Sequence, residues 1–354
     1  MFENFWHKKE KPFAGFQGFG GGAGGLATQA GGTPFSGTGG EVSAGVEPGN
    51  GYRYHYWKSD GTFVVDPEYN VEVDIDMLVI GGGGGGGGRA GGGGGAGGIV
   101  HGQSVPIPVA SAGDTIPVTV GEGGEGFGPG GSGGSVGTDS KFGTDPNPYY
   151  CIAVRGGAGG QNNDAPIGGG EGCSPGNVGC PGGSGGGDHV GSGAGEGTQP
   201  TQNPGKPWVT NYGNDGCGGA SGNICGAGGG AGGAAAFPSP TARGAAGDSA
   251  PFPDFSVPLF MPAPDPYRPG INPLPGSDYG GGGGAGYYPP NGPGLNMPSS
   301  ATNGGGGPGA PDSPTSPGVA GINGLGGGGG GAGNPNPVGG GNGGDGMVIL
   351  RYAV

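Results

Sequence analysis

The chain has 354 residues, of which 108 are Gly and 37 are Pro, the two types that helices and central strands tolerate least. This composition excludes ordinary enzyme domains, the lack of a strict Gly-X-Y period excludes collagen, and no apolar run approaches the roughly 18 residues of a membrane helix. With 12 Lys and Arg against 26 Asp and Glu, the formal charge is −14, which disfavours nucleic acid as a partner.

Residues 1–50 are predicted to be an arm, because their spaced aromatic residues lie among Gly, Ala, Ser and Thr and cannot bury one another. A signal peptide is not indicated, since the basic cluster is followed by neither an apolar core nor a cleavage site. The alternatives are an unordered tail and an anchor that docks on another protein of an assembly. The attachment candidates are the aromatic and basic residues Phe2, Phe5, Trp6, Lys8, Lys9, Lys11, Phe13, Phe16 and Phe19.

Residues 51–155 show the alternation of short strands. Residues 52–58 and 62–65 flank the turn Ser59-Asp60-Gly61, which predicts a hairpin. Residues 72–80 alternate acidic and apolar residues and then become fully apolar, so we expect a strand that starts half exposed and ends buried. Further strands are predicted at 98–102, 105–109, 115–120, 140–143 and 150–155. Regular turn signals between them indicate an antiparallel β-sandwich, and the overall class is all-β.

Residues 156–345 show no strand or helix period, but tracts of Gly recur between Asn-, Asp- and Pro-rich stretches. Gly adopts polyproline-II geometry without strain, and such helices can approach closely and hydrogen-bond to their neighbours. We therefore interpret this region as a large insertion of polyglycine-II-like helices and long loops. An unordered Gly linker is the alternative. Residues 346–354 form a strand that closes the sandwich and fixes the far end of the insertion.

Five cysteines are present, and none forms a CxxC pair, so a zinc or redox site is poorly supported. Cys151 lies in an apolar strand and is interpreted as a small buried residue. The other four form two loose pairs in Gly-rich loops, Cys173 with Cys180 and Cys217 with Cys225. Disulfides and free thiols are both open for these pairs, because the redox compartment is unknown.

Binding is better supported than catalysis. The four histidines lie far apart in the sequence, and no Gly-Lys-Ser/Thr motif for phosphate binding is present. Asp74 and Asp76 suit the solvated face of a strand. We therefore predict no enzyme activity, no cofactor and no metal site. Aromatic residues flanked by Pro, Ser, Asn and Gly are typical of recognition loops, although they could also pack as a satellite core. The receptor-contact candidates are Trp208, Tyr212, Phe252, Phe255, Phe260, Tyr267, Tyr287 and Tyr288.

Several stretches together resemble a known family: the aromatic-rich segment 51–63, Met77-Leu-Val-Ile-Gly81 entering polyglycine, Val118-Thr-Val-Gly-Glu-Gly-Gly124, and the terminal strand 346–352. They are similar to the glycine-rich domain of bacteriophage tail-fibre, tail-tip and minor virion proteins, frequent in phages of marine cyanobacteria. The resemblance implies a virion component, made in the host cytoplasm, oligomeric in its assembly and attached through its arm to other virion proteins. It implies an adhesin whose loops contact a host glycan or protein. Capsid decoration and an extracellular matrix role are the alternatives.

Overall fold

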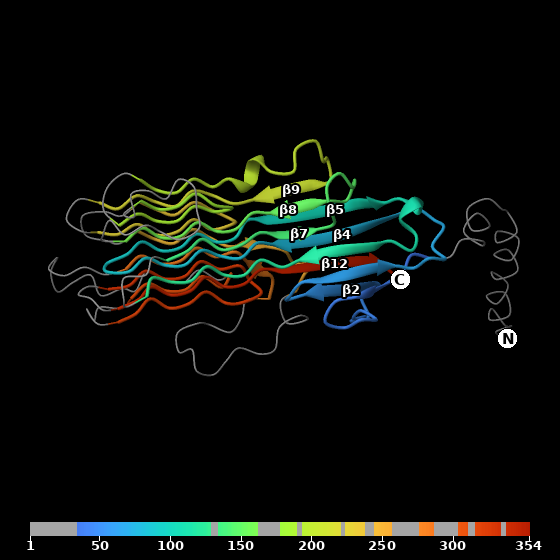
Figure 1. Cartoon of the computed structure of the whole chain (residues 1–354), viewed down its shortest axis with the longest axis horizontal. Helices are drawn as coiled ribbons and strands as arrows, with labels where there is room; N and C mark the ends of the chain where they lie inside the picture. The colour runs from blue at the N-terminus through green and yellow to red at the C-terminus, as the bar shows by residue number, and fades with distance from the viewer. Residues whose placement is uncertain are drawn as a thin grey trace, which may run out of the picture.

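The computed structural model describes residues 34–128, 134–161, 178–189, 193–220, 224–237, 244–256, 276–286, 304–310, 316–333 and 338–354. These residues form an elongated all-β molecule with two parts. Strands make a sandwich at one end, and extended Gly-rich segments continue along the same axis as a bundle (Figure 1). The two parts are continuous, because several strands lead directly into a segment of the bundle.

Two five-stranded antiparallel sheets form the sandwich. The first has the order β1-β3-β6-β7-β8, with β1 (Gly37–Gly39), β3 (Gly61–Val65), β6 (Thr115–Thr119), β7 (Ser140–Phe142) and β8 (Cys151–Ala153). The second has the order β2-β12-β4-β5-β9, with β2 (Tyr52–Trp57), β12 (Met347–Ala353), β4 (Val73–Ile80), β5 (Ile99–Ile107) and β9 (Val209–Tyr212). The remaining elements are the pair β10 (Ala250–Pro251) and β11 (Asp278–Tyr279), and the 3-10 turns η2 (Val109–Ser111) and η3 (Gln199–Thr201).

The predicted closure by the last strand is confirmed. β12 lies inside the second sheet and pairs with β2 on one side and β4 on the other. Val348 and Leu350 face the core between the sheets, whereas Ile349 faces a second core on the outer side of this sheet. Because this sheet is covered on both faces, the first four residues of β12 and the end of β4 are apolar without alternation.

The hairpin predicted from the turn at residues 59–61 is wrong, since β2 and β3 belong to different sheets. Trp57 at the end of β2 and Phe63 in β3 both point into the core between the sheets, with ring centroids 6.1 Å apart and an interplanar angle of 89°. The turn therefore carries the chain across the sandwich. Asp60 holds it in place by accepting a hydrogen bond from the Val120 N–H at 2.8 Å.

The boundary of the predicted arm is also wrong, because the sandwich begins before residue 51. Phe35 is buried edge-on against the Tyr352 ring, with centroids 4.8 Å apart, and β1 pairs with β3. The arm therefore ends ahead of Phe35. β9, a four-residue strand that pairs with β5, lies in the region that was predicted to have no strands.

Amide side chains join the two sheets along the edge formed by β8 and β9. The Ile152 N–H donates to Asn203 Oδ1 at 2.9 Å, and its carbonyl accepts from Asn203 Nδ2 at 2.9 Å. The amides of Asn203 and Gln199 both donate to Asn211 Oδ1 in β9, at 3.0 and 2.9 Å. The free edge of β8 is thus satisfied by side chains, which leaves less of its backbone open to pairing with another chain.

The predicted polyglycine-II-like packing is clearest around residues 81–88, which leave β4 and enter the bundle. N–H groups three residues apart donate to the same neighbouring segment, and carbonyls three residues apart accept from the same neighbouring segment. The donor pairs are Gly81, Gly84 and Gly87 to Gly98, Gly95 and Gly92; Gly82 and Gly85 to Thr138 and Ser135; and Gly83 and Gly86 to Gly344 and Gly341. The acceptor pairs are Gly82 and Gly85 with Gly156 and Gly159, Gly83 and Gly86 with Gly124 and Phe127, and Gly84 and Gly87 with Gly329 and Ala332. A three-residue repeat is the turn of a polyproline-II helix, and this one is surrounded by neighbours on all sides.

A helix at the edge of the bundle, residues 121–127, lacks some of these backbone neighbours and uses side chains instead. The N–H groups of Glu122 and Glu125 donate to Thr138 Oγ1 and Ser135 Oγ at 2.7 and 2.8 Å. On another side of this helix, the N–H groups of Gly123 and Gly126 donate to Asp345 Oδ1 and Asn342 Oδ1, both at 2.8 Å. The acceptors are therefore spaced three residues apart in the sequence, which matches the helix turn.

These contacts change the predicted domain limits. Residues 81–98 and 121–139 were assigned to the sandwich, yet their hydrogen bonds place much of both stretches in the bundle. The insertion is therefore not a single block after residue 155. The bundle is built from the segments that connect β4 to β5, β6 to β7, β8 to β9 and β9 to β12, whereas the other sandwich strands are joined by short turns or loops.

His55 is a fully buried histidine that links β1, β2 and β12. Its Nδ1 donates to the Gly39 carbonyl at 2.8 Å, and its Nε2 accepts from the Tyr352 hydroxyl at 3.2 Å. Phe63 packs edge-on against the imidazole, at 5.2 Å between centroids. Burial lowers the pKa of His55 from its usual 6.5, because a charged imidazole would lose its hydration.

Acidification is expected to destabilise the fold below about pH 6.5. Burial also lowers the pKa of His101 and His189, so the unfolded chain binds more protons than the folded chain once the pH falls below 6.5. The free energy of unfolding then decreases as the pH falls, by about 1.4 kcal/mol for each unit by which a pKa is lowered. Chemical unfolding at pH 7 and pH 5 measures this slope. His55→Gln should reduce it, and an unchanged slope would show that His55 does not titrate in this window.

Candidate recognition surface

Half of the predicted receptor-contact residues can be placed. Phe260, Tyr267, Tyr287 and Tyr288 lie outside the described residues, as do all nine attachment candidates of the arm. Phe252 and Phe255 are buried, whereas Trp208 and Tyr212 are half-buried. The placed residues gather around the second sheet, near β5 and β9, and not at the end of the bundle that is remote from the strands.

The assignment of Phe252 and Phe255 to receptor contact is wrong. Both rings pack on the outer face of the second sheet with Leu78 and Ile349. A tight turn brings them there, in which the Phe255 N–H donates to the Phe252 carbonyl at 2.9 Å. They form part of a satellite core, because a sheet with apolar residues on both faces needs cover on the second face as well.

Tyr212 in β9 lies at the rim of this satellite core. Its ring meets Phe252 edge-on, with centroids 5.1 Å apart and an angle of 87°. His101 in the adjacent β5 also meets Phe252 edge-on, at 5.3 Å. Tyr212 and His101 are therefore partly accessible groups held in fixed orientations by a buried ring.

Trp208 lies next to a lysine that was not predicted. The Lys206 ammonium lies over the Tyr150 and Trp208 rings, 4.9 and 5.6 Å from their centroids, and donates to the Tyr150 carbonyl. Burial lowers the pKa of Lys206. Both rings are thus occupied by a cation of the same chain, so Trp208 is less free to stack on a partner than its sequence context suggests.

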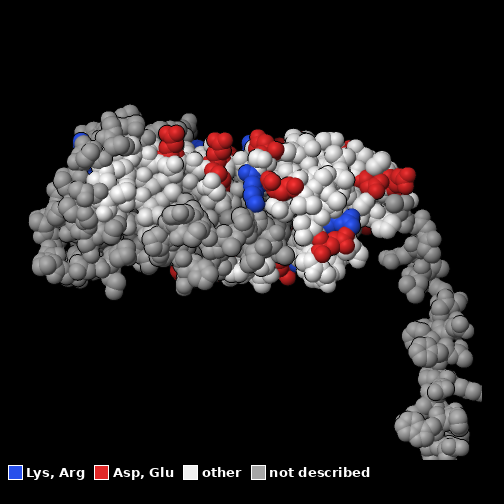
Figure 2. All heavy atoms as spheres, turned by 90° about the horizontal axis from the view of Figure 1, so that it is seen from below, with Lys and Arg blue, Asp and Glu red and all other residues white. Residues whose placement is uncertain are grey.

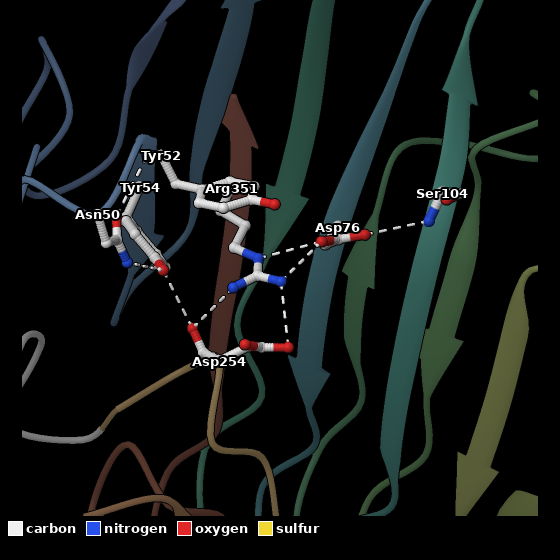
Figure 3. Close-up of polar contacts among 7 residues, drawn as sticks. All are labelled: Asn50, Tyr52, Tyr54, Asp76, Ser104, Asp254 and Arg351. Atoms are coloured by element: carbon white, nitrogen blue, oxygen red, sulfur yellow. Dashed lines mark hydrogen bonds and ion pairs between the residues drawn. The ribbon is translucent and has the colours of Figure 1, made fainter. Parts of the chain in front are cut away.

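The polar centre of this surface is Arg351, which projects from β12 (Figure 3). Its Nε and Nη2 donate to Asp76 Oδ2 at 3.0 and 2.9 Å, and Nη2 lies 3.2 Å from Asp254 Oδ2. The guanidinium carbon is 4.4 Å from the Tyr52 ring centroid and 5.3 Å from that of Phe255. The expected solvated role of Asp76 is therefore wrong, because its carboxylate holds Arg351 and also accepts the Ser104 N–H at 3.1 Å.

The two carboxylates that bind Arg351 should differ in their effect on stability. The Asp76 side chain is 23% exposed and that of Asp254 is 57% exposed, while that of Arg351 is 10% exposed. We expect Asp76→Ala to cost about 2–3 kcal/mol, because it leaves a largely buried guanidinium with one carboxylate. Asp254→Ala serves as the matched control and should cost about 1 kcal/mol or less, because water screens that pair. Equal losses in chemical unfolding would contradict this ranking.

The cysteines divide differently from the expected pairs. Cys180 is disulfide-bonded, and its predicted partner Cys173 lies outside the described residues. Of the two alternatives for Cys217 and Cys225, the structure has no disulfide, since neither cysteine is disulfide-bonded and both are buried in the bundle. Cys225 Sγ donates to the Ala90 carbonyl at 2.6 Å, and Cys217 Sγ accepts the Ala227 N–H at 3.1 Å. Each thiol therefore has its own backbone partner.

The thiols of Cys217 and Cys151 are poor nucleophiles. Burial raises the pKa of Cys217 to about 11 and that of Cys151 to about 12, so neither is a thiolate at neutral pH. Cys151 packs in the core between the sheets, which confirms its interpretation as a small buried residue. Within the described ranges, no three His, Cys, Asp or Glu side chains are grouped closely enough to hold a metal ion. In the same ranges, no helix has the length and apolarity needed to cross a bilayer.

The surface carries predominantly negative charge. Figure 2 shows one face on which acidic side chains are spread along both the bundle and the sandwich, with fewer basic side chains among them. This agrees with the formal charge of −14. Such a face favours a neutral or basic partner over a polyanion.

Comparisons with known proteins agree with the sequence and the fold. The family model of the glycine-rich domain matches residues 58–353, which covers most of the sandwich and the whole bundle. A search of the curated proteins finds no match to the chain.

Proposed function

The chain belongs to the glycine-rich domain family, and we propose that it is a structural protein of a bacteriophage virion, a tail-fibre or tail-tip adhesin that contacts the host surface. The observation that carries this proposal is the elongated bundle joined end to end with the sandwich (Figure 1). Its central helix is hydrogen-bonded to neighbours all around, so the bundle resists bending. A stiff projection suits a protein that must hold a contact surface away from a particle.

The direction of the chain indicates which end faces the particle. Residues 34–36 lead into β1, so the predicted arm precedes the sandwich and would attach that end to other virion proteins. After β4 the chain passes through the bundle, turns back at Arg89 and Ala90, and returns to β5. This turn is therefore remote from the strands, and a contact surface at that end would be held away from the particle.

Capsid decoration, in which the chain binds only the virion, is the alternative. A tail-tip protein would be present in few copies per particle, whereas a decoration protein would approach the copy number of the major capsid protein. Quantitative mass spectrometry of purified virions separates the two. A copy number near that of the capsid protein would contradict the adhesin role, and absence from virions would contradict both roles and favour an extracellular matrix protein.

Attachment through the arm can be tested with a chain that lacks residues 1–33. This truncation keeps Phe35 and β1, so the melting temperature should not change. Incorporation into particles should be lost, because the aromatic and basic attachment candidates are removed. Normal incorporation of the truncated chain would show that the sandwich or the bundle provides the attachment.

A further inference from the structure

A small hollow opens on the outer face of the second sheet, beside the satellite core. Its volume is about 200 Å³, and it lies between β5, β9 and the turn that carries the two buried Phe rings. The lining residues are His101, Gln103, Tyr212, Pro251, Phe252, Pro253, Asp254 and Phe255. Sites for drug-sized ligands have volumes of roughly 300–1,000 Å³, so this hollow suits a single small ring.

The hollow combines ring surfaces with polar groups that have no partner. Among the described residues, the His101 ring nitrogens, the Gln103 amide and the Tyr212 hydroxyl form no hydrogen bond within the chain. Burial lowers the pKa of His101, so at neutral pH its imidazole has one donor and one acceptor nitrogen. An apolar occupant would leave these groups unpaired, and hydroxyl groups on a compact ring would satisfy them.

The charges around the hollow argue against an acidic ligand. Asp254 borders it, and Asp76 lies on the adjacent strand. The cation nearby is Arg351, whose guanidinium is already bound to both carboxylates. Among the described residues around the hollow, an additional negative group would therefore meet a carboxylate with no free cation to balance it.

We propose that this hollow binds one neutral pyranose unit of a glycan. The proposal rests on the adhesin role and specifies its ligand class at a site on the side of the molecule. The apolar face of the sugar would lie against the half-buried ring of Tyr212, which the buried Phe252 ring holds in place. Its hydroxyls would bond to Gln103, His101, Asp254 and the Tyr212 hydroxyl, the donor and acceptor types that surround the hollow.

The test is saturation-transfer NMR on the full chain with methyl β-D-glucopyranoside, methyl β-D-galactopyranoside and methyl α-D-mannopyranoside, and with N-acetylneuraminic acid as the acidic comparison. We expect at least one neutral glycoside to bind. Gln103→Ala should weaken that binding at least about fivefold without changing the melting temperature, because this side chain is exposed and unpaired. Thr115→Ala, an exposed position on the other sheet, is the control and should bind as the wild type does.

Tyr212→Phe provides a second variant, since it keeps the ring contact with Phe252 and removes only the hydroxyl. Failure of all three neutral glycosides to bind, tighter binding of the acidic sugar, or unchanged binding in both variants would overturn the proposal. The NMR experiment uses the isolated chain, whereas mass spectrometry of purified virions tests whether the protein is part of the particle. If no sugar binds but the protein is found in virions, only the sugar site is rejected. If a sugar binds but the protein is absent from virions, only the virion role is rejected.

Discussion

Removal of residues 346–354 is expected to leave the chain insoluble. β12 lies between β2 and β4 and hydrogen-bonds to both, so its loss would open the second sheet in the middle. It would also expose both cores at once, because Leu350 packs between the sheets and Ile349 packs on the outer face. The last seven strand residues thus hold together elements that begin some 300 positions earlier in the chain.

A point substitution in β12 tests the contribution of this strand to stability in a protein that stays soluble. Leu350 is fully buried, so Leu350→Ala should cost about 2–5 kcal/mol of unfolding free energy. Ala353→Asp, at the exposed end of the same strand, is the control and should change stability by about 0.5 kcal/mol or less. Denaturant unfolding followed by tryptophan fluorescence measures both. A truncated chain that stays soluble with an unchanged melting temperature would contradict the central role of β12.

The strands that sequence reasoning found are those whose local pattern reflects their burial. β4 begins with exposed and intermediate positions and ends in four buried ones, as the change from alternation to a continuous apolar run predicts. β12 was recognisable for the same reason. Such patterns reveal whether one or both faces of a strand are covered, because buried positions are apolar and exposed positions are polar.

Pairing could not be predicted in the same way. The turn at residues 59–61 has hairpin chemistry, yet Trp57 and Phe63 draw the two strands onto opposite sides of one core. β1 and β9 contain Gly, Thr and Asn with little apolar signal, and they are held by hydrogen bonds to strands distant in the sequence. These are tertiary effects that override local propensity.

Composition alone could not distinguish a ring that covers a sheet from a ring that meets a partner. Phe252 and Phe255 were therefore grouped with Trp208, although they pack on the outer face of the second sheet and Trp208 packs against the core between the sheets. One usable signal was overlooked in the bundle. Ser135 and Thr138, and Asn342 and Asp345, are polar pairs spaced by three in Gly-rich sequence, and each pair accepts backbone hydrogen bonds at the bundle edge. This spacing is a marker of edge positions in a three-residue helix.

Gly85→Ala is expected to destabilise the protein by about 3 kcal/mol or more, although Gly→Ala usually stabilises a chain when the backbone permits it. Gly85 lies in the central helix of the bundle, where its N–H donates to the Ser135 carbonyl at 3.0 Å and its carbonyl accepts the Gly159 N–H at 2.9 Å. A Cβ at this position would overlap the Glu125 carbonyl group. Because that obstacle is backbone, relief requires the two helices to separate and to lose buried hydrogen bonds.

Gly276→Ala is the matched control, because a Cβ there would meet no atom within 4 Å and the residue is exposed. We expect it to leave stability unchanged or to raise it by up to about 1 kcal/mol. Chemical unfolding of the two variants therefore separates two explanations of the high Gly content. If Gly serves only to keep the chain flexible, both substitutions should stabilise by restricting the unfolded state. If Gly is needed for close approach, the effects have opposite signs, since buried Ala is accepted only where the packing leaves room for a methyl group, as at Ala96 and Ala158. Stabilisation by Gly85→Ala would exclude the hydrogen-bonded packing on which the stiffness of the bundle depends.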